Sequence, residues 1–131
     1  MQKVMIVGGG VGGTTVLKLL SESEVFSIVC MADTNESAEG MLAAKERRIP
    51  TVTNWSEGLD GDLDIIFDTT GDPTVYSKIK RDMSDQTILI PGSVALIMTK
   101  LFEEKNRLIN KLENTSAKMD LILNTTSEGM V

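Results

Sequence analysis

Six consecutive residues of this chain, Gly8 to Gly13, include five glycines and follow directly after a short apolar run. The run, residues 3–7, is typical of a strand that is buried on both faces. From Val11 to Leu20 the apolar residues recur at helical spacing. The chain must therefore pass from a strand to a helix through a loop that carries almost no side chains.

The loop contains the pattern G-x-G-x-x-G at Gly8, Gly10 and Gly13, in the strand–loop–helix context that dinucleotide binding requires. Gly8 would permit a tight turn, Gly10 would let the backbone approach a pyrophosphate, and Gly13 would let the helix pack on the strand. Thr14 stands where a Walker A loop has lysine. The alternative is that the glycines serve packing alone, in a domain with an empty crevice. The candidate binding residues of the loop are Gly8, Gly9, Gly10, Val11, Gly12 and Gly13.

Four more apolar runs alternate with helical patterns along residues 25–92. They predict strands over Val25–Met31, Pro50–Thr53, Asp64–Phe67 and Thr87–Ile90, and helices over Ser37–Arg48 and Pro73–Met83. Met41, Leu42 and Ala44 should face inward from the first of these helices. This alternation predicts a Rossmann-like three-layer α/β/α fold, with a five-stranded parallel sheet in the order 3-2-1-4-5 and a long C-terminal helix.

Asp33 follows the second predicted strand, 25 positions after Gly8. A carboxylate at this place can accept hydrogen bonds from the adenosine ribose and would repel a 2′-phosphate. Because no arginine occurs in residues 33–40, the sequence favours NAD over NADP, with Thr34 as a neighbouring candidate. The alternative is that Asp33 or Asn35 only caps the next helix.

The segment 68–73 follows the fourth predicted strand, where ligands of this fold bind near the topological switch. Thr69, Thr70 and Gly71 are candidates for contacts with the second ribose or the nicotinamide. Equally, Asp72 can serve as the cap of a helix that begins at Pro73.

From Ser93 onward no glycine or proline occurs before Gly129, which predicts a helix of about 30 residues. Lys105 and Thr115 interrupt an otherwise apolar heptad seam, which favours a parallel homodimer through this helix. The apolar seam positions are Met98, Leu101, Leu108, Leu112, Met119 and Ile122.

Composition narrows the functional classes further. The net charge of −6 argues against nucleic acid and anionic membrane surfaces as partners, and no apolar run is long enough to span a membrane. The absence of histidine removes Ser-His and Cys-His catalysis and histidine-ligated metals, so we expect neither catalytic nor metal-binding residues. Cys30, the single cysteine, is interpreted as a buried hydrophobe in a cytoplasmic protein.

Residues 32–35, 48–51 and 64–73 look like the NAD-binding halves of homoserine-dehydrogenase and other oxidoreductase families. The chain resembles even more closely the N-terminal Rossmann modules of prokaryotic PAS-containing signalling proteins, which include sensor histidine kinases and enhancer-binding transcription activators. Residues 121–131 are similar to the opening of a PAS domain. The resemblance implies a dinucleotide-binding domain over 1–92, a connecting and dimerisation helix over 93–125, and the start of a missing PAS domain over 126–131.

The resemblance implies a regulatory module that binds NAD(H) or a related nucleotide and passes the signal through the dimeric C-terminal helix to a PAS or output domain. We do not expect an enzyme, because no substrate domain or proton-transfer residue follows the fifth strand. Two alternatives stay open. The chain can be the cofactor-binding half of an NAD-dependent dehydrogenase, or a structural dimerisation module with an empty crevice.

Overall fold

The computed structural model of this chain describes residues 1–59 and 62–130, with side chains described through residue 111. The residues fall into two compact units, Met1–Thr99 and Lys100–Val131. The first unit carries the sheet and the helices that cover it.

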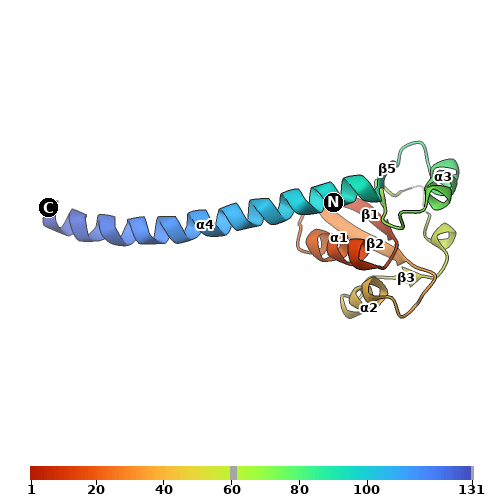
Figure 1. Ribbon diagram of the computed structural model, residues 1–131, viewed down its shortest axis with the longest axis horizontal. Helices are drawn as coiled ribbons and strands as arrows, with labels where there is room; N and C mark the ends of the chain where they lie inside the picture. The colour runs from red at the N-terminus through yellow and green to blue at the C-terminus, as the bar shows by residue number, and fades with distance from the viewer. Residues whose placement is uncertain (60–61, 131) are drawn as a thin grey trace. The chain divides into compact units, whose positions relative to one another are not determined.

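The first unit contains five parallel strands in the order β3-β2-β1-β4-β5 (Figure 1). This confirms the predicted Rossmann-like fold and its strand order. The strands are β1 (Gln2–Val7), β2 (Phe26–Ala32), β3 (Thr51–Val52), β4 (Ile65–Asp68) and β5 (Ile88–Pro91). The helices are α1 (Val11–Ser21), α2 (Glu39–Glu46), the 3-10 turn η1 (Trp55–Gly58), α3 (Pro73–Asp82) and α4 (Gly92–Met130).

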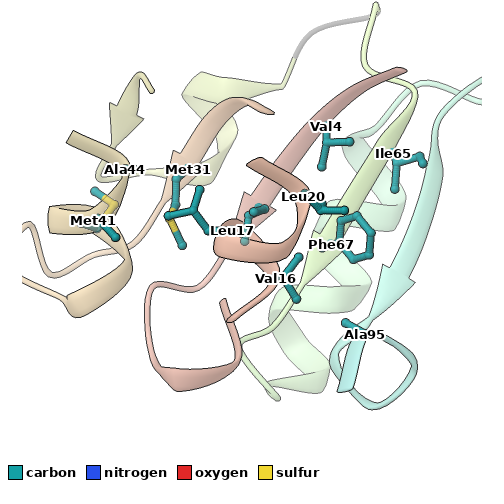
Figure 2. Packing of buried hydrophobic residues seen from close by; sticks show 12 residues of the cluster. Val4, Val16, Leu17, Leu20, Met31, Met41, Ala44, Ile65, Phe67 and Ala95 are labelled. Atoms are coloured by element: carbon teal, nitrogen blue, oxygen red, sulfur yellow. The ribbon is translucent and has the colours of Figure 1, made fainter. Parts of the chain in front are cut away.

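Strand β1 lies at the centre of the sheet, and its side chains alternate between two apolar layers. Val4 and Ile6 belong to the cluster that includes α1 and α2, and Figure 2 shows Val4 near Leu17 and Leu20. Met5 belongs to the cluster on the opposite face, together with Ile79 of α3. Two covered faces explain why β1 reads as a continuous apolar run.

Helix α2 differs from its prediction in length and in one inward residue. It begins at Glu39 and ends at Glu46, since Arg48 adopts a left-handed φ of 59° that a helix cannot continue through. Met41 and Ala44 are buried as expected, but Leu42 is 49% exposed. The prediction for Leu42 was wrong because Gly40 lies against the glycine loop and sets which face of α2 turns inward.

Helix α4 ends at Met130, whereas the predicted helix ended at residue 125. It therefore includes residues 126–130, which were assigned to the start of a PAS domain. Its first turns pack within the first unit through Ala95 and Met98, so Met98 faces that core and not a free seam. Leu101 and Leu108 are 65% and 49% exposed. The seam positions from Leu112 onward, including Thr115, Met119 and Ile122, lie outside the described side chains, and the homodimer stays a prediction. None of the helices in the described part of the chain is long and apolar enough to cross a membrane.

Candidate functional site

The glycine loop is built on two positions where a side chain would not fit. Gly8 has a φ of +103°, which strongly favours glycine. A Cβ on Gly13 would lie 1.7 Å from the carbonyl oxygen of Gly8. The predicted roles of Gly8 in the turn and of Gly13 in close packing are therefore confirmed.

Gly10 differs from these two glycines. A Cβ at this position would meet no atom within 4 Å, and its φ of −77° is open to any residue. Packing alone therefore explains Gly8 and Gly13 but does not explain Gly10. The space in front of Gly10 is the space that a phosphate would need.

Helix α1 begins directly behind this space. Its N-cap is Gly10, which provides no side-chain cap, and its first turn contains no acidic residue. The first intrahelical bond runs from Thr14 N to Gly10 O at 2.9 Å. The N–H groups ahead of Thr14 thus form a helix N-terminus without a competing anion, the arrangement that binds phosphate.

The loop is held in place through the peptide groups of Gly9. Asp33 accepts a hydrogen bond from Gly9 N at 2.6 Å through Oδ2, and one from Asn35 N at 2.8 Å through Oδ1. Gly40 N donates to Gly9 O at 2.7 Å. The N-cap of α2 is Ala38, without a side-chain cap bond. The alternative in which Asp33 or Asn35 caps α2 is therefore wrong, and the ribose contact of Asp33 stays a prediction.

The segment after β4 lies against the glycine loop. The hydroxyl oxygen of Thr69 is 2.9 Å from Val7 O and 3.0 Å from Gly8 O. Thr70 donates to Asp68 Oδ1 through its N–H and its hydroxyl, at 3.0 and 2.6 Å. Asp72 caps α3 by accepting a bond from Thr74 N at 2.9 Å. The capping role foreseen for Asp72 is thus confirmed.

Two cavities border the carboxyl ends of β1 and β4, where the sheet reverses its winding. The smaller, of about 500 Å³, is lined by predicted residues from both loops. The larger, of about 860 Å³, lies along the first turns of α1, α3 and α4. Thr69 and Asp72 line both cavities, so the two form adjoining parts of one crevice.

The structure brings most of the predicted site residues to this crevice. Gly8, Gly10, Asp33, Thr34, Thr69 and Thr70 line the smaller cavity, and Val11, Gly12, Thr69 and Gly71 line the larger one. Gly9 and Gly13 line neither, because their positions support the loop from behind.

Several lining residues were not among the predicted site residues. Trp55 and Val75 line the smaller cavity, and Asp68, Tyr76 and Thr99 line the larger one. The strand order was a usable signal, since it places the residues after β3 and in the first turn of α3 at the same edge of the sheet as the glycine loop. Asp68 belongs to the segment 68–73, which the sequence already placed at the ligand-binding edge of the sheet. Thr99, a buried residue of α4, gives no such signal.

Neither a metal centre nor a reactive thiol emerges from the described residues. No group of three or more acidic or cysteine side chains within them could hold a metal ion. Cys30 is buried, and burial raises the pKa of its thiol, which keeps it protonated and unreactive.

No family model matches this chain. Among curated proteins it is 31% identical over 77 residues to acetaldehyde dehydrogenase 1 from Parafrankia sp. (strain EAN1pec), which covers 52% of this chain and 23% of that protein. The chain thus spans less than a quarter of the length of the relative that it matches.

This similarity corrects the expectation that the chain is not an enzyme. The relative is a dehydrogenase, so the finding points to an oxidoreductase. The expectation rested on the lack of a proton-transfer residue in these 131 residues, whereas a dehydrogenase can carry that residue outside the domain that binds its cofactor. The resemblance to PAS-containing signalling proteins and the domain boundaries that it implies stay predictions.

Proposed function

We propose that this chain is the NAD(H)-binding half of an oxidoreductase of the dehydrogenase type. The observation that carries the proposal is the open space at Gly10, between a turn that needs Gly8 and a helix contact that needs Gly13. Packing would admit a side chain at this position, whereas a phosphate that approaches the backbone would exclude one. The similarity to a dehydrogenase supports the same assignment.

The two cavities suit the two halves of a dinucleotide. Asp33 and Thr34 in the smaller cavity would take the adenosine ribose, and Trp55 and Val75 would offer apolar surface to the adenine. The larger cavity, beyond Thr69, would take the nicotinamide half. When bound, the nicotinamide ring supplies hydride transfer. A small aldehyde is the first substrate class to test, given the name of the relative.

The charges around the crevice favour NAD over NADP. No lysine or arginine lines either of the two cavities described above, so nothing there would neutralise a 2′-phosphate. Each oxygen of Asp33 accepts one backbone bond and keeps a second lone pair for a ribose hydroxyl. The carboxylate can therefore hold the loop and bind ribose at the same time.

The proposal is tested by calorimetric titration of the full 131-residue chain with NAD⁺, NADH and NADP⁺. We expect NAD⁺ and NADH to bind and NADP⁺ to bind more weakly. The bound form should also melt at a higher temperature by mass action. The absence of both heat and thermal shift at millimolar dinucleotide would reject the proposal.

Replacing Asp33 with asparagine should reduce the preference for NAD⁺ over NADP⁺. The change removes the charge that repels a 2′-phosphate but keeps one oxygen acceptor for the loop. We expect NAD⁺ binding to weaken by about 1.5–3 kcal/mol, the range for a hydrogen bond to a charged group, while NADP⁺ weakens less. Calorimetry with both ligands measures the ratio. Equal weakening of both ligands would mean that Asp33 only supports the loop.

A further inference from the structure

Asp68 is the last residue of β4 and pairs with Val7 of β1 at the topological switch. It is only 2% exposed, yet it lines the larger cavity. Nothing in the loop-supporting network described above requires a charge at this place. A buried carboxylate is costly beside apolar surface unless hydrogen bonds or an opposite charge offset that cost.

The side-chain hydrogen bonds of Asp68 are accepted by one of its two carboxylate oxygens. Both bonds from Thr70 end on Oδ1. Within the part of the chain that the structure describes, no buried side-chain oxygen or nitrogen lacks a hydrogen-bond partner. Oδ2 accepts neither of these bonds and is therefore not fully buried. The larger cavity is the opening that Asp68 lines, so the carboxylate carries its negative charge at the wall of that cavity.

The residues that line the larger cavity include no cation that would neutralise this charge. Val11, Val16 and Leu96 provide apolar walls to the cavity, which lower the local dielectric constant. No lysine or arginine is among the residues that line it, and Asp72 at the rim adds a second carboxylate. Asp72 is exposed, so water screens its charge more than that of Asp68.

We propose that Asp68 makes the crevice prefer the oxidised form of the cofactor. This inference rests on the proposed function and on the nicotinamide half entering the larger cavity. The nicotinamide ring is cationic in NAD⁺ and neutral in NADH, whereas the rest of the molecule is the same. A buried carboxylate beside the ring stabilises the cation and leaves the neutral ring almost unaffected.

The test compares dissociation constants of NAD⁺, NADH and ADP-ribose for the full chain and for two matched variants, Asp68→Asn and Asp72→Asn. In Asp68→Asn the advantage of NAD⁺ over NADH should fall by on the order of tenfold, the effect of one opposite charge within a few ångströms. ADP-ribose has no nicotinamide ring and reports any change in the rest of the site. Asp72→Asn keeps a helix cap and should change the ratio much less.

The outcomes separate this inference from the proposed function. If neither dinucleotide binds the wild-type chain, the proposed function fails. If both bind and the ratio is the same in Asp68→Asn, the function stands and the role of Asp68 is overturned. If Asp68→Asn does not fold, the wild-type ratio decides, since the inference requires NAD⁺ to bind more tightly than NADH.

Discussion

Replacing Gly13 with alanine is expected to lower the free energy of unfolding by about 3 kcal/mol or more, at the upper end of overpacking effects. The new Cβ would lie 1.7 Å from Gly8 O and 2.9 Å from the hydroxyl oxygen of Thr69. The nearer atom belongs to a backbone that is fixed between β1 and α1, so it cannot rotate away. Urea unfolding followed by circular dichroism measures the loss.

Gly10→Ala is the matched control for this change. It adds the same methyl group three residues earlier, where a Cβ meets nothing within 4 Å. We expect its free energy of unfolding to lie within about 1 kcal/mol of the wild-type value, since alanine is only a poorer N-cap than glycine. Equal stability of the Gly13→Ala and Gly10→Ala variants would show that α1 does not pack on the loop as described.

Gly10→Val should abolish dinucleotide binding while the fold persists. The extended backbone of Gly10, with φ −77° and ψ −158°, accepts a branched side chain. That side chain would occupy the approach to the N-terminus of α1, and the lost phosphate contacts should weaken NAD⁺ by more than about 100-fold. Calorimetry measures the affinity, and thermal unfolding without ligand verifies the fold.

The series glycine, alanine and valine at position 10 makes the steric explanation testable. Affinity should fall with each step in side-chain size, whereas the melting temperature without ligand should change little. Unchanged affinity in Gly10→Val would mean that the ligand does not approach over this loop, and the proposed function would lose the observation that carries it.

Sequence reasoning predicted the strands and their order because the information is local. Each strand is an apolar run closed by glycine, proline or a polar residue, and the connections between parallel strands follow chirality rules. Gly8, Gly10 and Gly13 were assigned correctly to the loop for the same reason. The prediction that the loops after β1 and β4 lie together followed from the rule that the carboxyl ends of parallel strands meet at one edge of the sheet.

The failures depend on tertiary contacts that no local pattern contains. Leu42 was placed inward from helical spacing, but a Cβ on Gly40 would lie 2.9 Å from Gly9 Cα, so this contact sets the rotation of α2. Trp55 reaches the crevice through a 3-10 turn capped by Asn54; the strand order indicates the edge of the sheet where this turn lies, but the polar residues around Trp55 do not show that its side chain lines a cavity. The expectation that the chain is not an enzyme was wrong because it relied on the absence of histidine and of other proton-transfer residues. That absence says nothing about catalytic residues carried by another domain.

The Gly9 peptide groups, held by Asp33 on one side and by Gly40 on the other, have a consequence for the thermodynamics of recognition. A loop fixed by its own scaffold loses its conformational entropy when the protein folds and not when a ligand arrives. The binding site is then preorganised, and its affinity for a ligand becomes sensitive to substitutions outside the crevice. A substitution that makes α2 more mobile also makes the glycine loop more mobile. The ligand must then order the loop when it binds, which weakens the observed affinity. Selection for tight binding would in this way act as selection for a rigid α2, although that helix lies outside the crevice.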